Sequence, residues 1–170
     1  MTKQVPQQPI HRVGLGTDLH RLAPGRKLII GHIPIEYDRG PVSHSDGDVL
    51  LHAVIDALAG AAGLPDIGEM FPDNDPAHAG ADSGELLSEV VQRVADQGFG
   101  IVNLDATIHA QQPSLKPYKQ RIRQEVARLL EIGPEAVSIK AKTNEEVDAV
   151  GRREAIACSV VVGLNILNDG

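Results

Sequence analysis

Two separate parts of the chain combine carboxylate and imidazole side chains at spacings that suit a metal ion. Asp18 and His20 are two residues apart in a segment expected to be extended, so both side chains point to the same side. Such a pair alone is more often a polar strand end, but His52, near the start of an expected helix, is the natural third ligand. Zinc binds imidazole nitrogen and carboxylate oxygen, and catalytic zinc takes three protein ligands and leaves one position open. The pattern therefore predicts a zinc site, with a neighbouring carboxylate orienting the second ring nitrogen of His52.

The second of these parts begins with the polar run His44-Ser45-Asp46-Gly47-Asp48. Ser45 and Asp48 have the spacing of a capping box at a helix N-terminus. Asp48, His52 and Asp56 follow at intervals of four, which places them on one helix face. A capped helix with a solvated side explains Ser45 and Asp48, but it explains less well why two histidines gather at one end of an apolar helix. We expect His44 to be free to contact a substrate.

Three further segments are candidates for contacts with an anionic substrate. Ala110–Lys116 lies between an expected strand and a helix, whose N-terminus suits an anion. Lys140–Glu145 and the later Gly151-Arg152-Arg153 place cations near a strand end in an acidic protein, which suits phosphates. A solvated basic loop explains these cations equally well. The remaining polar segment, Asp66–Asp75, has the composition of a turn-rich connector.

Length and composition restrict the class of protein. The chain has 170 residues, of which 42% are hydrophobic and 23% charged, so we expect one folded domain over residues 11–170 after a disordered or extended tail of residues 1–10. A net charge of −7 and an aromatic content of 2% argue against a nucleic-acid partner. The apolar runs are too short to cross a membrane, and the N-terminus has neither a signal-peptide nor a transit-peptide pattern. The single cysteine, Cys158, excludes an internal disulfide, and we predict a cytoplasmic location.

Hydrophobic periodicity predicts an α+β fold. Helices are expected over 49–62, 84–97 and from Ser114 or Pro117 to Glu131, and a hairpin over 27–30 and 33–37. Strands are expected over 11–18, 101–110, 137–141 and 155–167, which gives a four-stranded sheet with helices on one face. The last strand is apolar at nearly every position, which is typical of a strand buried on both faces. We therefore expect another subunit of a homo-oligomer to cover the other face of the sheet.

Taken together, these motifs resemble the 2-C-methyl-D-erythritol 2,4-cyclodiphosphate synthase family over Arg12–Leu167. The resemblance is carried by Gly16-x-Asp18-x-His20, His44–Asp48, Asp66–Gly68, Phe71–Asp73 and Gly151-Arg152, in the family's order and spacing. It implies a homotrimer with active sites between subunits. The sequence departs from the family's common pattern at Ser114, Lys142, Ala149 and Arg153.

The resemblance also implies a role for each matching residue. Asp18, His20 and His52 match the zinc ligands, His44 and Thr143 the catalytic residues, and Glu145 the ligand of a second divalent ion, Mg²⁺ or Mn²⁺. Asp18, His20, His44 and Ser45 match contacts to the methylerythritol phosphate end of the substrate. Further substrate contacts match Asp66, Ile67, Gly68, Phe71, Pro72, Asp73, Asn74 and Asp75. The pocket for the cytidine diphosphate part, on the adjacent subunit, matches Ala110, Gln111, Gln112, Pro113, Ser114, Leu115, Lys116, Ala141, Lys142 and Thr143, with Asn144, Glu145, Ala149 and Arg152 beside it.

The implied reaction is an intramolecular phosphoryl transfer. The 2-phosphate of 4-diphosphocytidyl-2-C-methyl-D-erythritol 2-phosphate attacks the β-phosphorus, which expels CMP and forms a cyclic diphosphate. Two anionic phosphates must meet, so the site needs cations, and it needs no protein nucleophile. Two alternatives remain at this point: another metal-dependent phosphohydrolase, and a non-catalytic oligomer stabilised by zinc.

Overall fold

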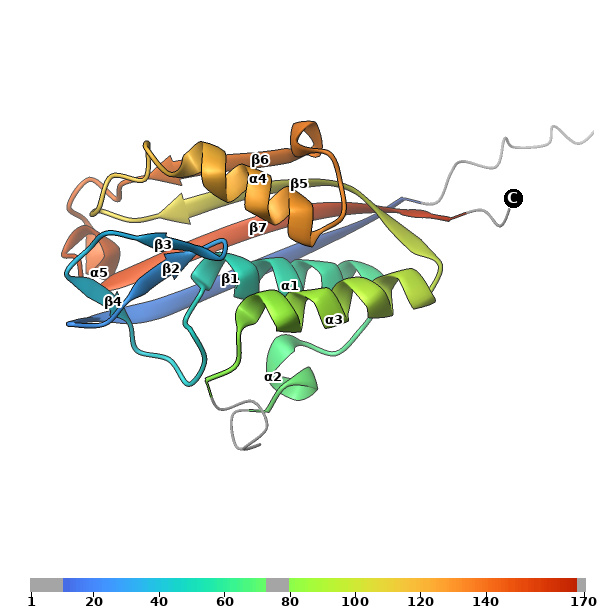
Figure 1. Ribbon diagram of the computed structural model, residues 1–170, viewed down its shortest axis with the longest axis horizontal. Helices are drawn as coiled ribbons and strands as arrows, with labels where there is room; N and C mark the ends of the chain where they lie inside the picture. The colour runs from blue at the N-terminus through green and yellow to red at the C-terminus, as the bar shows by residue number, and fades with distance from the viewer. Residues whose placement is uncertain (1–10, 73–79, 168–170) are drawn as a thin grey trace, which may run out of the picture.

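The computed structural model describes residues 11–72 and 80–167, and the expected N-terminal tail lies outside them. These residues form a five-stranded mixed sheet and a separate two-stranded hairpin (Figure 1). The sheet order is β4-β1-β7-β5-β6. Its strands are β1 (His11–Pro24), β4 (Arg39–Pro41), β5 (Phe99–His109), β6 (Val137–Lys142) and β7 (Ala155–Ile166).

Three helices cover one face of the sheet (Figure 1), which confirms the predicted α+β fold. They are α1 (Val49–Ala62), α3 (Ser83–Asp96) and α4 (Lys119–Leu129). Two single turns of helix, α2 (Ile67–Met70) and α5 (Asp148–Gly151), and a 3₁₀ turn, η2 (Pro134–Ala136), complete the helical elements. None of the helices in the described residues is long and apolar enough to span a bilayer.

The structure differs from the sequence prediction in its short elements and in the length of β1, which was expected to end at residue 18 but continues to Pro24. The sheet has a fifth strand, β4, because three residues that read as a loop pair with the end of β1. A side chain at Gly40 of β4 would place its Cβ 2.1 Å from the carbonyl oxygen of Lys27, so this close approach needs glycine. The turns α2 and α5 were also expected to be loops. Elements of three or four residues are too short to show a hydrophobic period.

Within this chain the strand β7 is buried on one face only, and the burial of its other face by another subunit stays a prediction. Its alternate residues Ile156 to Leu164 are fully buried beneath the helices, whereas Val161 is 43% exposed on the other side. On the same open face, β1 exposes Val13, Leu15 and Leu19, each by more than 60%. The open face of the sheet therefore carries an apolar strip that this chain does not cover.

Two glycines allow α1 to lie directly on β1. A Cβ at Gly14 would be 1.9 Å from the carbonyl oxygen of Ala57, and one at Gly16 would be 1.9 Å from that of Ala53. The next two residues on this face of the strand are Asp18 and His20. The strand thus carries its carboxylate and imidazole past the N-terminal end of the helix, where His52 is located.

The hairpin of β2 (Leu28–Ile30) and β3 (Ile33–Ile35) is attached to the start of α1 by one carboxylate. Asp48 is the N-cap of α1 and accepts hydrogen bonds from the backbone N–H groups of Leu50 and Leu51. It also accepts from the N–H groups of Gly31 and His32 in the hairpin turn, at 2.9 and 2.7 Å. The predicted capping box was therefore wrong, because Asp48 itself is the cap.

Candidate active site

Three predicted metal ligands, Asp18, His20 and His52, meet at the N-terminal end of α1. Asp18 Oδ2 is 3.0 Å from His20 Nε2 and 3.1 Å from His52 Nδ1, and these two nitrogens are 3.1 Å apart. Asp18 and His20 are neighbours on one face of β1, and α1 contributes His52 from above that face. Among the described residues, this is the one group of three or more His, Cys, Asp or Glu side chains with ligand atoms close enough to bind a metal ion together.

The electrostatics of this triad favour a cation. Burial raises the pKa of Asp18, but the hydrogen bonds and charges of His20 and His52 together outweigh burial and hold this pKa well below its usual range. Burial lowers the pKa of His52, but the carboxylates of Asp18, Asp48 and Asp46 together raise it above its ordinary value. A cation between the two ring nitrogens and the carboxylate oxygen would interact favourably with all three atoms.

The donor set fits zinc. Two imidazole nitrogens and one carboxylate oxygen are ligands that zinc accepts at about 2.0–2.2 Å. Tetrahedral bonds of that length place ligand atoms roughly 3.3 Å apart, close to the edges of the triangle described above. The described residues supply no fourth carboxylate, imidazole or thiolate to this group. These three ligands by themselves would leave one position of a four-coordinate zinc open.

The second ring nitrogen of His52 contacts two hydroxyl groups. Its Nε2 is 2.9 Å from Ser83 Oγ and 3.2 Å from Ser45 Oγ. The sequence had predicted a carboxylate as the partner, and that prediction was wrong for the direct contact. Asp46 provides a carboxylate one step further away, because it accepts the hydroxyl hydrogen of Ser83. No sequence signal singles out Ser83 for this position, because it comes from the start of α3, which is distant from His52 in the sequence.

A pocket of about 350 Å³, which we call the triad pocket, opens beside these ligands. The triad lines this pocket together with residues that were predicted to contact a substrate. These residues are His44, Ser45, Ile67, Gly68 and Phe71. Val42, Ser43, Ala81 and Leu86 also line it, although the sequence had not indicated them. The segment 66–71, which read as a connector, is held there because Asp56 Oδ1 accepts a hydrogen bond from the backbone N–H of Ile67 at 2.9 Å.

Several other residues that were predicted to contact a substrate beside the triad do not line the triad pocket. Asp66 is the N-cap of α2 and accepts a hydrogen bond from the backbone N–H of Glu69 at 2.9 Å. Pro72 is partly buried outside the lining. Asp73, Asn74 and Asp75 lie outside the described residues.

The predicted contacts that follow the strands β5 and β6 line a separate cavity of about 470 Å³, which we call the loop pocket. The strands β5 and β6 are parallel, so their carboxyl ends lie side by side, with His109 opposite Lys142. The loops that follow these ends meet there, and the N–H of Ala110 donates to the carbonyl oxygen of Lys142 at 2.9 Å. The lining residues are Ala110, Gln111, Gln112, Pro113, Ser114, Leu115, Lys116, Lys119, Ala141, Lys142 and Thr143.

The other residues that were predicted to contact a substrate near the loop pocket lie beside it and not in its lining. Glu145 is exposed and its Oε1 accepts a hydrogen bond from Thr143 Oγ1 at 2.9 Å. Asn144 bridges His109 Nδ1 and Asp148 Oδ2, at 3.1 and 2.9 Å. Ala149 lies in α5, and Arg152 pairs with Glu154 at 3.0 Å, so neither reaches the lining. Lys119 lines the loop pocket although sequence reasoning did not select it.

The two pockets lie at the same end of the sheet but on different strands. Asp18 is opposite Cys158, Cys158 is opposite Ile108, and Ile108 is opposite Ala141, so these residues form one row across four strands. With strands about 4.8 Å apart, Ala141 lies roughly 14 Å from Asp18 along this row. The triad pocket and the loop pocket are therefore distinct cavities of one chain.

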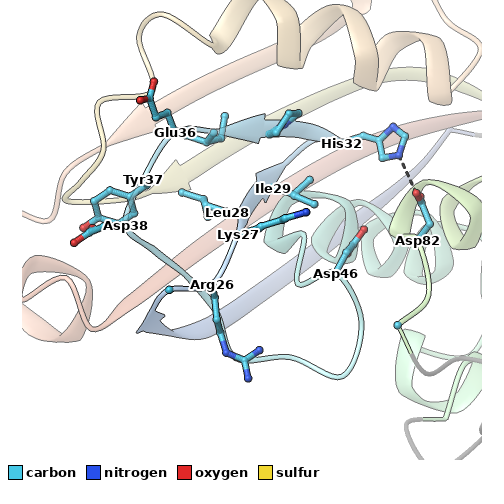
Figure 2. A pocket seen from close by; sticks show the side chains of 14 residues that line it. Arg26, Lys27, Leu28, Ile29, His32, Glu36, Tyr37, Asp38, Asp46 and Asp82 are labelled. Atoms are coloured by element: carbon cyan, nitrogen blue, oxygen red, sulfur yellow. Dashed lines mark hydrogen bonds and ion pairs between the residues drawn. The ribbon is translucent and has the colours of Figure 1, made fainter.

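A third cavity, of about 660 Å³, lies under the hairpin and is called the hairpin groove (Figure 2). Arg26, Lys27 and Tyr37 are among its lining residues, and His32 and Asp82 close one end through a hydrogen bond of 3.1 Å. None of the residues predicted to bind metal or substrate lines this groove.

Comparison with known proteins places the chain among related sequences. A model described as the YgbB family matches residues 11–165. A protein of Oryza sativa subsp. japonica named 2-C-methyl-D-erythritol 2,4-cyclodiphosphate synthase, chloroplastic, is 52% identical over 151 residues, which are 89% of this chain and 68% of that protein. A Bordetella avium protein named 2-C-methyl-D-erythritol 2,4-cyclodiphosphate synthase is 53% identical over 150 residues, which are 88% of this chain and 93% of that protein.

Solved structures agree with this relationship. The bifunctional IspDF from Campylobacter jejuni superimposes with a TM-score of 0.90 and 37% identity, over 94% of this chain and 43% of that chain. A structure of 2C-methyl-D-erythritol-2,4-cyclodiphosphate synthase in a form bound to CDP superimposes with a TM-score of 0.84 and 33% identity. It covers 90% of this chain and 99% of that chain.

Proposed function

The chain belongs to the YgbB family, and we propose that it converts 4-diphosphocytidyl-2-C-methyl-D-erythritol 2-phosphate to 2-C-methyl-D-erythritol 2,4-cyclodiphosphate and CMP. An oxygen of the 2-phosphate forms a bond to the β-phosphorus, and the bond from that phosphorus to the bridging oxygen of CMP breaks. The chain therefore acts as a cyclising phosphorus–oxygen lyase in the synthesis of isoprenoid precursors. The observation that carries this proposal is the grouping of three potential metal ligands, Asp18, His20 and His52, in one pocket.

In this proposal, Asp18, His20 and His52 bind one Zn²⁺, and Glu145 binds Mg²⁺ or Mn²⁺. When bound, these ions supply positive charge that offsets the repulsion between the two phosphates and stabilises the charge of the transition state. His44 and Ser45 line the same pocket as the triad and orient the methylerythritol phosphate end. Ile67, Gly68 and Phe71 line the same pocket and exclude water from the reacting groups.

The loop pocket binds the cytidine diphosphate part in this proposal. The side chains of Lys116, Lys119 and Lys142 line it and offer positive charge to the phosphates. Thr143 also lines it, and its hydroxyl, which donates to Glu145, stabilises the transferring phosphoryl group in this proposal. Holding both phosphates of one substrate in place removes much of the entropic barrier of the reaction.

We further propose that the protein is a homotrimer in which the triad pocket of one subunit faces the loop pocket of its neighbour. Two observations support this arrangement. The two pockets are separate cavities of one chain, and the open face of the sheet exposes Val13, Leu15, Leu19 and Val161. Stable homo-oligomer interfaces are large and apolar, and this strip is suited to one. Sedimentation that shows a monomer at micromolar concentration would contradict the arrangement.

The domain boundary at residue 11 and a cytoplasmic location remain predictions. Limited proteolysis tests the first, and fractionation of the source cells tests the second.

The decisive experiment is product analysis. The purified protein, loaded with Zn²⁺ and supplied with Mg²⁺ and the cytidyl substrate, is followed by ³¹P NMR. We expect a cyclic diphosphate and CMP to appear in equal amounts. A metal-dependent phosphohydrolase would give linear phosphates instead, and a non-catalytic oligomer would give no product.

A further inference from the structure

The hydrogen bonds around His52 extend away from the proposed metal into the interior of the protein. Its Nδ1 faces Asp18 and His20, and its Nε2 faces Ser83 Oγ at 2.9 Å and, at the longer distance of 3.2 Å, Ser45 Oγ. Ser83 is the first residue of α3 and is fully buried. Its hydroxyl hydrogen is directed at Asp46 Oδ1, and its backbone N–H donates to Asp46 Oδ2 at 2.9 Å.

The direction of each hydrogen bond follows from the groups involved. An ionised carboxylate only accepts hydrogen bonds, so Ser83 must donate its hydroxyl hydrogen to Asp46. The lone pairs of Ser83 Oγ are then left to accept, and the partner that donates is the Nε2–H of His52. A neutral imidazole carries one ring hydrogen, so Nδ1 is left with a lone pair that points toward Asp18 and His20.

The position of Ser83 is itself held by the surrounding structure. Asp82, the N-cap of α3, contacts His32 Nε2 at 3.1 Å, and Glu125 of α4 contacts His32 Nδ1 at 3.0 Å (Figure 2 shows the first contact). The backbone of Asp46 donates to the carbonyl oxygen of Ala81, which fixes the loop of Asp46 beside the start of α3. Ser83 therefore meets His52 from a rigid helix terminus.

We propose that Ser83 and Asp46 are positioning residues for the metal, because they hold the hydrogen of His52 on Nε2 and so present Nδ1 as a ligand. The proposal rests on the proposed function only in taking the triad as a metal site. Groups that orient a metal-bound histidine typically contribute 10- to 100-fold to metal affinity. Ser83 and Asp46 act through His52, and neither of them lines the triad pocket.

The test compares Ser83→Ala with Ser88→Ala. Both substitutions remove a hydroxyl from α3, but that of Ser88 donates to the carbonyl oxygen of Gly84 within the helix and does not reach His52. The Kd for Zn²⁺ is measured on the full-length protein by competition with a chromophoric chelator. We expect Ser83→Ala to raise this Kd about 10- to 100-fold and Ser88→Ala to leave it within about twofold.

A spectroscopic measurement separates positioning from a general loss of structure. Long-range ¹H–¹⁵N correlation spectra of the zinc-free protein at about pH 8.5 report which nitrogen of His52 carries the hydrogen. We expect the Nε2–H form in the wild type and in Ser88→Ala, and a mixture of both forms in Ser83→Ala. If Ser83→Ala does not fold, Asp46→Asn is measured in the same way. The amide introduced by this substitution can donate a hydrogen bond to Ser83 Oγ, so the hydroxyl hydrogen of Ser83 can turn toward His52 Nε2.

A zinc Kd within twofold of the wild type, or an unchanged Nε2–H form, would overturn the proposal. An equal loss of zinc affinity in Ser88→Ala would overturn it as well. Failure of the wild type to form the cyclic product in ³¹P NMR would instead count against the proposed function, since zinc affinity and the state of His52 are measured without substrate.

Discussion

The triad pocket and the loop pocket differ in how far the chain itself has arranged their polar groups. In the triad pocket, each nitrogen of His52 has a partner, and the side chains of Asp18, His20 and His52 are all less than a quarter exposed. In the loop pocket, Lys142 and Thr143 are exposed, and the carboxylate of Glu145 is held by one hydroxyl. The first pocket is built on a strand and a helix, the second on loops after two strand ends.

This difference has a physical meaning for function. A site that binds an ion tightly must be formed beforehand, because each ligand that has to be ordered on binding costs conformational entropy. A site that receives a flexible substrate and a second ion can gain its order from them. We therefore expect substitutions in the triad pocket to affect metal binding, and those in the loop pocket to affect turnover or substrate affinity.

The largest effect is expected for His52→Ala. Loss of a direct ligand should cost more than the 10- to 100-fold of an orienting group, so zinc affinity should fall by more than about 100-fold, and cyclase activity with it. Alanine is a good helix former, so the zinc-free variant should stay folded. Metal content by mass spectrometry and circular dichroism measure the two properties. His44→Ala is the matched control, because His44 lines the same pocket outside the triad, and it should lose activity while keeping zinc.

A second prediction concerns Glu145→Gln. The variant should keep zinc and oligomeric state, and its turnover at low Mg²⁺ should fall at least about tenfold, since a divalent ion contributes several kcal/mol to such a transition state. High Mg²⁺ or Mn²⁺ should restore part of the rate, because phosphate oxygens remain as ligands. Glu146→Gln changes the adjacent exposed carboxylate and should have a much smaller effect. If Glu145→Gln keeps the turnover of the wild type at low Mg²⁺, Glu145 is not a ligand of the second ion.

A smaller effect is expected for Lys142→Gln. An exposed charge pair contributes up to about 1 kcal/mol, so the affinity for CDP should fall by up to about fivefold, less at high salt. Lys140, two residues earlier on β6, already pairs with Asp105 at 2.7 Å and does not line the loop pocket. Lys140→Gln should therefore leave CDP affinity unchanged. Titration calorimetry at two salt concentrations measures both variants, and equal losses would show that the loop pocket does not distinguish them.

The smallest effect concerns the pH dependence of stability through His32. Glu125 and Asp82 raise the pKa of His32 above its ordinary value, although partial burial opposes them. Arg128 and His32 lower the pKa of Glu125 to about 2, so this partner stays ionised in the folded protein. Because the folded pKa of His32 is raised, its contribution is fully present below about pH 6.5 and is lost as the pH rises through the folded pKa. The carboxylate of Asp48 accepts from the backbone N–H of His32 rather than from its imidazole ring.

His32→Asn isolates this contribution, because asparagine tolerates the positive φ of 62° and does not titrate. Urea unfolding of the zinc-free proteins, at one protein concentration, should show a loss of a few tenths to about 1 kcal/mol at pH 5.5. The loss should shrink at pH 8.5. The same difference in unfolding free energy at both pH values would exclude a charged His32 as its source.

Several features of this protein were determined by local sequence patterns. The helix α1 begins and ends where its apolar period predicts, and the pairing of Asp18 with His20 needed only the alternation of a strand. His52 could be chosen as the third ligand because helix capping alone does not account for a histidine in the first turn of an apolar helix. The family motifs extended this reasoning to the loops, where no period exists.

Tertiary structure alone decided the partners that come from distant segments. Ser83 reaches His52 because α3 packs against α1, and Asp48 caps its helix while also binding the hairpin turn, 16 and 17 residues earlier. Gly14 and Gly16 look like flexible residues in the sequence, yet their missing side chains set the distance between β1 and α1. Local patterns depend on neighbours along the chain, whereas these contacts depend on packing between elements, whose distances and angles no single segment encodes.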